Sequence, residues 1–294
     1  MLSLSPQLCY DMVNWDGISN RSVTVMARKE GRLRVVVKVG TSTLTHDTGR
    51  LNLYSMERLS RTLSDLEGMG HEIILVSSGA IGIGTAKMGL AERPTQLRMK
   101  QAAAAVGQCM MMHLYDKMFG EYNRVVAQIL LTGEDVDAPV RAEHLHNTFE
   151  SLLELGIIPV VNENDSVSSA EIETGQCKVL GDNDTLSAMV ARLCRADLLV
   201  LLSDIDGLYD SDPRQNPEAK LIHRVEAVTP ELRAMAGGAG SWRGTGGMAT
   251  KLNAAEIAMA AGVDMVITNG TRPEDLYGIL RGEDIGTRFL AARS

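Results

Sequence analysis

The sequence is poor in aromatic residues and has no long apolar run. Tyr, Trp and Phe make up 4% of the 294 residues, which is a weak basis for stacking nucleic-acid bases. The formal net charge of −8 also argues against a basic surface for nucleic acid or anionic lipid. Apolar stretches such as residues 198–202 fall far short of the ~18 residues that span a bilayer. We therefore expect a protein that binds neither nucleic acid nor membranes.

Cysteine is scarce as well. The four cysteines, Cys9, Cys109, Cys177 and Cys194, lie far apart and form no C-x-x-C pair. Neither a disulfide framework nor a zinc site is indicated, and a reducing cytoplasm is the expected location. The H-E-x-x-H, G-x-S-x-G and Walker A motifs are also missing from the sequence. No residue is therefore predicted to be a metal ligand.

Regular structure is predicted from Leu33 onward. Short runs of Val, Ile and Leu alternate with segments of helical period, which is typical of parallel strands covered by helices. We predict strands at residues 33–39, 72–77, 125–131, 157–161, 197–202 and 263–268. Helices are expected at residues 53–69, 95–118, 141–155, 185–195 and 248–260. This order predicts an α/β fold, a three-layer α/β/α sandwich with a mainly parallel central sheet.

Three other parts of the chain lack this alternation. Residues 1–32 show no helical or strand period and are expected to form a weakly ordered N-terminal extension. Residues 166–181 and 203–225 are polar, contain glycine or proline, and are expected to form loops or short hairpins. No low-complexity linker divides the remainder, so residues 33–294 are expected to be one domain with two lobes.

A lysine inside an apolar strand is the first candidate functional residue. Lys38 lies in the segment V-K-V-G-T-S at residues 37–42. A lysine is almost never buried without a partner, and the glycine-hydroxyl turn after it offers backbone N–H groups to a phosphate. The alternative is an edge-strand lysine that extends to solvent. In an open parallel sheet ligands bind at the carboxyl ends of the strands, which favours the functional interpretation.

Serines and glycines follow the second predicted strand. Residues 77–84, S-S-G-A-I-G-I-G, lead from that strand into a helix. The free N–H groups of a helix N-terminus bind anions, so this segment is a candidate for an anionic substrate. A serine cap with glycines needed only for close packing explains the same residues equally well.

Two polar turns carry more carboxylates and amides than a turn needs. Residues 162–165, N-E-N-D, follow a strand, and residues 181–185, G-D-N-D-T, precede a helix. An ordinary turn or N-cap uses one or two such side chains. The surplus indicates a group that positions lysines, a metal or a substrate ammonium. A solvated turn and plain capping are the alternatives.

A glycine run precedes the last long helix. Residues 244–251, G-T-G-G-M-A-T-K, match the dinucleotide pattern G-x-G-x-x-A, but a loop rather than a strand comes before them, so that match carries no weight. We favour a glycine-rich lid over a triphosphate, with Lys251 reaching in from the first helical turn. A plain flexible loop is the alternative.

Taken together and in this order, the five segments resemble the amino acid kinase family, and within it the members that phosphorylate glutamate for proline synthesis. The resemblance runs from about Leu33 to Phe289. It implies that ATP and L-glutamate give glutamyl 5-phosphate and ADP, with Mg²⁺ as cofactor, and that the N-terminal lobe holds glutamate and the C-terminal lobe ATP. It also implies inhibition by proline and a homo-oligomer, either a dimer or a tetramer.

The resemblance assigns roles to individual residues. It makes Lys38, Lys251 and Asp184 catalytic. Glutamate is assigned to Ser78, Gly79, Asn162, Asp165 and Asn183. ATP is assigned to Lys38, Ser203, Asp204, Thr245, Gly246, Gly247, Met248, Ala249, Thr250 and Lys251. A γ-carboxylate has a reference pKa near ~4.3 and needs no general base, so the obstacle is repulsion between anions, which lysines, helix N-termini and Mg²⁺ relieve.

Two features depart from the family pattern. Bacterial members often continue into a C-terminal PUA domain, and this chain is expected to be a form without one. Residues 173–180 also make the segment before Gly181 longer than in the shortest members. Two other functions stay open: a sibling kinase acting on acetylglutamate, aspartate, carbamate or a nucleoside monophosphate, and a non-catalytic amino-acid sensor. A sensor would be expected to lack one of the two lysines.

Overall fold

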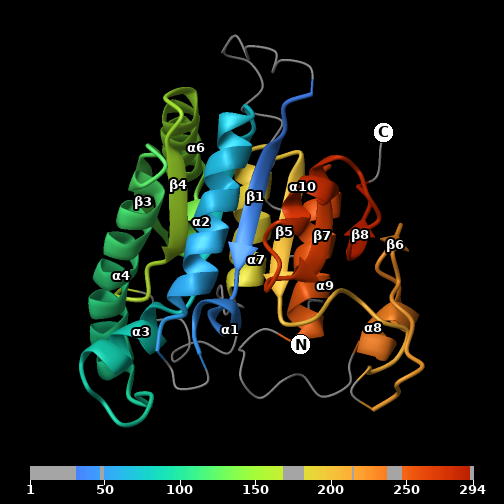
Figure 1. Ribbon diagram of the computed structural model, residues 1–294, viewed down its shortest axis with the longest axis horizontal. Helices are drawn as coiled ribbons and strands as arrows, with labels where there is room; N and C mark the ends of the chain where they lie inside the picture. Colours follow the sequence, from blue (N-terminus) through green and yellow to red (C-terminus); the bar gives the residue numbers. More distant parts are fainter. Residues whose placement is uncertain (1–30, 47–49, 168–181, 214, 237–246, 292–294) are drawn as a thin grey trace, which may run out of the picture.

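The computed structural model describes residues 31–46, 50–167, 182–213, 215–236 and 247–291. Within these ranges eight strands form one sheet in the order β3-β4-β2-β1-β5-β7-β8-β6 (Figure 1). They are β1 Arg34–Val39, β2 Glu72–Ser77, β3 Val126–Leu131, β4 Ile158–Glu163, β5 Leu198–Ser203, β6 Arg224–Val225, β7 Asp264–Asn269 and β8 Thr287–Phe289. The strands from β3 to β7 run parallel, whereas β8 is antiparallel to β7. The predicted mainly parallel sheet is confirmed.

Helices connect most of the strands. In the described part of the chain they are α1 Thr41–Leu44, α2 Leu53–Gly68, α3 Ala80–Lys87, α4 Leu97–Gly120, α5 Gly133–Asp137, α6 Pro139–Glu154, α7 Asn183–Leu193, α8 Pro230–Ala236, α9 Met248–Ala260 and α10 Asp275–Leu280. Each predicted strand and helix is present within one or two residues at either end. α9 and β2 have the predicted bounds.

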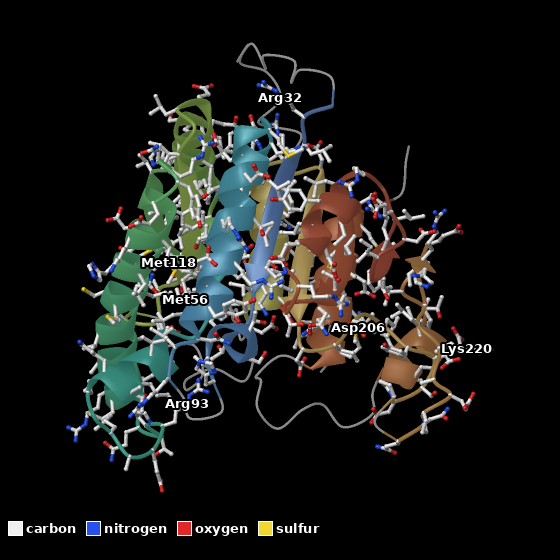
Figure 2. All side chains as sticks on the ribbon, viewed as in Figure 1. Arg32, Met56, Arg93, Met118, Asp206 and Lys220 are labelled. Carbon is white, nitrogen blue, oxygen red and sulfur yellow. The ribbon has the colours of Figure 1, made fainter. Side chains whose placement is uncertain are left out.

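The sheet separates two hydrophobic cores. On one face, α5, α6, α7 and α9 pack against the sheet around Phe149, Leu186 and Leu252. On the other face, α1, α2, α3, α4 and α10 pack around Leu63 and Tyr115. Figure 2 labels Met56 on α2 and Met118 on α4, which both belong to this second core. The predicted three-layer sandwich is therefore confirmed.

The side chains of β1 alternate between the two faces of the sheet, and this alternation decides which of them face α7 and α9. Val35, Val37 and Val39 point into the core with α2 and α4, while Val36 points into the core with α7 and α9. Lys38 is two residues after Val36, so its side chain lies on the same face of the sheet, the α7 side. β1 is a central strand between β2 and β5, which rules out the alternative of an edge-strand lysine.

Two glycines let α4 lie directly against α3. A Cβ atom on Gly84 would stand 1.7 Å from the Ala103 carbonyl oxygen, and one on Gly107 would stand 1.8 Å from the Ala80 carbonyl oxygen. Any side chain at either position would separate the helices. The close-packing interpretation of the glycines in residues 77–84 is thus right for Gly84, and this contact brings the middle of α4 to the start of α3.

The predicted loops lie partly outside the described residues. The N-terminal extension is described only at residues 31 and 32, and the 173–180 segment and Gly181 are not described. Residues 203–225 contain an isolated antiparallel bridge between Tyr209 and Leu221, as expected of a short hairpin. The Met-rich part of α4 is only partly core: Met111 is fully buried, whereas Cys109 is exposed.

Candidate active site

The candidate site lies where the parallel strands end. β1, β2, β4 and β5 all finish at the edge of the sheet toward which the arrow of β1 points in Figure 1, and α1 and α3 lie at that edge. Helices α7 and α9 begin there as well: Asp184 in the first turn of α7 pairs with Lys38 near the end of β1, and Lys251 in the first turn of α9 pairs with Asp184. Segments far apart in the sequence are thereby brought together, as expected for an open parallel sheet.

Three charged side chains form the centre of the site. The Lys38 ammonium lies 2.6 Å from Oδ1 of Asp184, and the Lys251 ammonium lies 3.1 Å from Oδ2. Lys38 is 8%, Lys251 6% and Asp184 1% exposed. The structure thus brings together the three residues predicted to be catalytic, from β1, α7 and α9.

Asp184 is ionised despite its burial. Burial alone would raise the pKa of its carboxyl, but the charges of Lys38 and Lys251 outweigh that effect and lower the pKa to about 2. Two ammonium groups and one carboxylate leave this buried group with a net positive charge. Such an arrangement attracts an anion to the carboxyl edge of the sheet.

Helix capping explains why Asp184 is available to the lysines. Asp182 is the N-cap of α7, and its side chain accepts a hydrogen bond of 2.7 Å from the backbone N–H of Thr185. Capping therefore uses Asp182, and Asp184 is the surplus carboxylate. On α9, the Thr250 hydroxyl lies 3.0 Å from Oδ2 of Asp184 and 2.8 Å from the Gly247 carbonyl oxygen, and it donates its one proton to either acceptor.

The segment after β2 presents a helix start to the same space. Gly79 is the N-cap of α3 with φ of 99°, a conformation that favours glycine, and no side chain caps this helix. A Cβ atom there would also stand 3.2 Å from Cγ2 of Thr41. Ser78 is buried and donates a hydrogen bond of 3.1 Å to the Val39 carbonyl oxygen, which ties the end of β2 to the end of β1.

The turn after β4 lines a hollow beside α3. Asp165 contributes to the wall of this hollow, together with Ala80 and Gln108. Asn162 lies beneath the turn, where it is 2% exposed and donates a hydrogen bond of 2.9 Å from Nδ2 to Oε1 of Gln108. Asn183, the first residue of α7, is half-buried and its Oδ1 has no hydrogen-bond partner among the described residues.

The predicted ATP residues that the structure describes lie at the end of β5 and at the start of α9. Ser203 ends β5 and is buried, with its hydroxyl 3.2 Å from Oδ1 of the exposed Asp204. Gly247 is the N-cap of α9 and has no side chain to cap the helix, and a helix N-terminus favours an anion. Met248 and Ala249 form the first turn. Thr245 and Gly246 lie outside the described residues.

Two polar groups at this edge were missed by the sequence interpretation. One is Gln108, an amide within the apolar face of α4; its position between Ala104 and Met111 at helical spacing is the signal that points to it. The other is a pair formed by Asn269, at the end of β7, and Asp206, which accepts a hydrogen bond of 2.9 Å from it. Figure 2 labels Asp206 at the site edge of the sheet.

The comparisons with known proteins were decisive for the family. The model of the amino acid kinase family matches residues 33–269. The chain belongs to the amino acid kinase family. A glutamate 5-kinase of Clostridium perfringens is 55% identical over 260 residues, covering 88% of this chain and 96% of that relative. A glutamate 5-kinase of Listeria monocytogenes is 52% identical, covering 88% and 94%. These relatives confirm the predicted enzyme class and the predicted branch of the family.

Solved structures confirm the fold of this kinase. A UMP kinase from Bacillus anthracis superposes with a TM-score of 0.59 at 16% identity, covering 88% of this chain and 96% of that chain. A carbamate kinase from Giardia lamblia bound to AMP-PNP gives 0.61 at 14% identity, covering 88% and 98%. Across the described residues of the kinase, no helix combines the length and the apolar character that crossing a membrane requires.

Proposed function

We propose that the chain transfers the γ-phosphoryl group of ATP to the γ-carboxylate of L-glutamate, giving glutamyl 5-phosphate and ADP in the first step of proline synthesis. The observation that carries the proposal is the buried Asp184 shared by Lys38 and Lys251 at the carboxyl edge of the sheet. Identities of 50–55% to glutamate 5-kinases across 87–88% of the chain support glutamate as the acceptor.

The two lysines act on the charge that moves during transfer. The γ-carboxylate and the triphosphate are both anions, so bringing them together is the main obstacle to reaction. Lys38 and Lys251, aimed by Asp184 and held in a space with little water, stabilise the phosphoryl group as it passes between the two oxygens. Thr250 holds the start of α9 against Asp184, which fixes the position of Lys251.

The substrates occupy opposite sides of this centre. Glutamate lies between the start of α3 at Ser78 and Gly79 and the turn at Asp165, with its ammonium toward the Asp165 carboxylate and with Asn183 beside it. ATP lies over the end of β5 and the start of α9, with its triphosphate on residues 245–251 and with Ser203 and Asp204 beside it. The open helix starts at Gly79 and Gly247 support anions at both places.

Mg²⁺ fits this site as a companion of ATP rather than as a resident metal. The part of the chain that the structure describes has no group of three or more His, Cys, Asp or Glu side chains placed to hold a metal. Asp184 is already paired with two ammonium groups. Mg²⁺ usually keeps several waters and binds through substrate phosphates, where it neutralises part of their charge. Asp204, which is exposed at the end of β5, is the carboxylate that would meet such an ion.

The proposed reaction is tested with purified protein and hydroxylamine, which traps an acyl phosphate as a hydroxamate. We expect ATP-dependent hydroxamate formation with L-glutamate and none with aspartate, and no ADP release with acetylglutamate, carbamate or UMP. If turnover is faster with one of those acceptors than with glutamate, that acceptor is the substrate. Absence of turnover with all of them would favour the amino-acid sensor.

Proline inhibition is part of the proposal. Proline keeps the α-carboxylate and the amine of glutamate but lacks a γ-carboxylate, so it can occupy the Asp165 end of the site and leave the acceptor position empty. We expect proline to raise the apparent KM for glutamate with little effect on ATP, and D165N to weaken both ligands. Proline binding that is unchanged in D165N, or that persists at saturating glutamate, would indicate a separate site.

The proposal also includes a homo-oligomer, a dimer or a tetramer, in the cytoplasm, where ATP and glutamate are available. Analytical ultracentrifugation of the purified protein tests the assembly state, and a monomer at micromolar concentration would contradict it.

A further inference from the structure

A buried amide at the substrate side of the site has an unused hydrogen-bond donor. Gln108 is 7% exposed, and its Oε1 accepts a hydrogen bond of 2.9 Å from Nδ2 of Asn162. Its Nε2 is also buried and has no partner among the described residues. A buried donor without an acceptor destabilises the folded protein, so its retention calls for an explanation.

Gln108 lines the hollow next to the start of α3. The other lining residues are Ala80, Ala104, Leu130, Glu163, Asn164, Asp165 and Ser166. The hollow lies between α3, α4 and the turn after β4. The close contact of α3 and α4 at Gly84 and Gly107 is what brings Gln108 to this wall.

The wall combines two acidic side chains with one neutral buried amide. The carboxylates of Asp165 and Glu163 favour an ammonium group and repel a carboxylate. A ligand that carries both groups on one carbon can therefore place its ammonium toward Asp165 only if a donor receives its carboxylate. The Nε2 group of Gln108 is such a donor, and Asn162 holds the opposite end of the amide in place.

We infer that Gln108 is a specificity-determining residue that donates a hydrogen bond from Nε2 to the α-carboxylate of the acceptor amino acid. The inference rests on the proposed function and deepens it. It explains why a buried glutamine lies in an otherwise apolar helix face. It also predicts that the protein selects acceptors with an α-carboxylate and discriminates against the same chain without one.

Two substitutions at residue 108 separate the donor from the packing. Q108M keeps the length of the side chain and removes both polar atoms. Q108E keeps an oxygen that accepts from Asn162 but replaces the donor with an anion. Q101M is the matched control, because Gln101 lies on the same helix, is half-buried and does not line the hollow. Thermal melting shows whether each variant is folded.

The readouts are KM for glutamate, kcat, and inhibition by 4-aminobutyrate, which is glutamate without its α-carboxylate. Q108M is expected to raise KM about ten- to a hundredfold, the size of one hydrogen bond to a charged group, with kcat at saturating glutamate nearly unchanged. The inhibition constant of 4-aminobutyrate should be the same in Q108M as in the unmodified protein. In Q108E the rise in KM should diminish, relative to the unmodified protein, as the pH is lowered and the new carboxyl is protonated.

Several outcomes would overturn the inference. They are an unchanged KM in Q108M and Q108E, equal weakening of glutamate and 4-aminobutyrate in Q108M, or the same rise in KM in Q101M. If Q108M does not fold, Q108E alone decides, because it keeps the acceptor for Asn162. The unmodified protein is assayed first with glutamate, and its inactivity would refute the proposed function. An active protein whose KM for glutamate does not change on substitution of Gln108 would refute only this inference.

Discussion

Strand β1 carries two buried cations at its opposite ends, and their surroundings differ. Arg34, at the start of the strand, is 4% exposed, and Lys38, near its end, is 8% exposed. Arg34 faces more negative charge than it carries, whereas Lys38 shares one carboxylate with a second cation. The two ends of one strand therefore show how a buried charge that stabilises the fold differs from one that is available for chemistry.

Arg34 is fully used by the protein. Its guanidinium contacts the Glu72 carboxylate at 2.6 Å, forms a two-pronged pair with Glu150, and donates a hydrogen bond of 2.6 Å to the Cys194 carbonyl oxygen. Burial opposes its charge, but these hydrogen bonds and carboxylates raise its pKa. The network joins β1, β2 and α6 to the residue after α7, so we assign it to folding.

Lys38 and Lys251 outnumber the carboxylate that they share. One carboxylate, that of Asp184, serves both ammonium groups. A phosphate can accept hydrogen bonds from these ammonium groups, because a lysine donates up to three. An imbalance of buried charge at the end of a strand thus indicates a ligand site more directly than burial of a charge does.

The largest expected effect is on turnover at the lysine end. Lys38→Ala and Lys251→Ala should each lower kcat about 10²- to 10³-fold, or about 3–4 kcal/mol of transition-state stabilisation. Glutamate binding, measured by titration calorimetry, should change only a few-fold, and the protein should stay folded because Asp184 keeps one lysine. Near-normal turnover in either variant would contradict the assignment.

A substitution of Arg34 should change the stability of the fold rather than turnover. Arg34→Met removes the partner of two half-exposed carboxylates and should lower the free energy of unfolding by about 3 kcal/mol, while kcat per folded molecule stays within about twofold. Arg224→Met is the matched control, since Arg224 and its partner Asp284 are both more than half exposed and such pairs contribute about 0–1 kcal/mol. Urea unfolding measures both. A loss of turnover in folded Arg34→Met would contradict the assignment of Arg34 to folding alone.

Acid should remove the stabilising contribution of Asp184 within a defined pH range. Because the pKa of Asp184 is lowered to about 2 in the folded protein, its contribution is present above the unfolded-state pKa near ~3.9 and is lost as the pH falls toward 2. The contribution is about 2 kcal/mol. The unfolding free energy of D184N should therefore depend less on pH between about 4 and 2 than that of the unmodified protein. A carboxyl resonance of Asp184 that titrates near 4 in the folded state would contradict this.

The lysine end of this contrast could be predicted from the sequence. A lysine within an apolar strand and a surplus aspartate at a helix start both indicated the site, because neither position is explained by strand or cap formation. The sequence could not predict that Asp182 would cap α7 and leave Asp184 to two lysines, since that depends on contacts between β1, α7 and α9. The same limit applies to Gln108, whose role depends on the contact of α3 and α4.

Short elements were the part of the fold that the sequence did not reveal. Helices α5, α8 and α10 each span fewer than two full turns, which is too short for a hydrophobic period to emerge. β6 and β8 have two and three residues and are defined only by their pairing beside β7. Buried parallel strands and long helices were predictable because their patterns repeat.

The smallest expected effect concerns a neutral buried pair beside the end of β1, on the opposite face of the sheet from Lys38. Tyr115 of α4 is fully buried, and its hydroxyl lies 2.9 Å from the Ser77 hydroxyl at the end of β2. Burial raises the pKa of Tyr115 more than this hydrogen bond lowers it, so the phenol stays neutral. Tyr115→Phe removes one neutral hydrogen bond and should cost about 1 kcal/mol of unfolding free energy.

Its effect on catalysis decides whether this pair belongs to the fold or to the site. Ser77 directly precedes Ser78, so a shift of β2 would reach the glutamate side and raise KM for glutamate. The neighbouring Ser78 hydroxyl is held independently by the Val39 carbonyl oxygen, and we therefore expect KM to change less than twofold. Steady-state kinetics of Tyr115→Phe at 25 °C measures this, with Tyr122→Phe as the control because Tyr122 bonds Glu57 away from the site. A large rise in KM in Tyr115→Phe alone would mean that β2 transmits core packing to the substrate, and that a neutral buried pair can influence the site as strongly as unbalanced charge does.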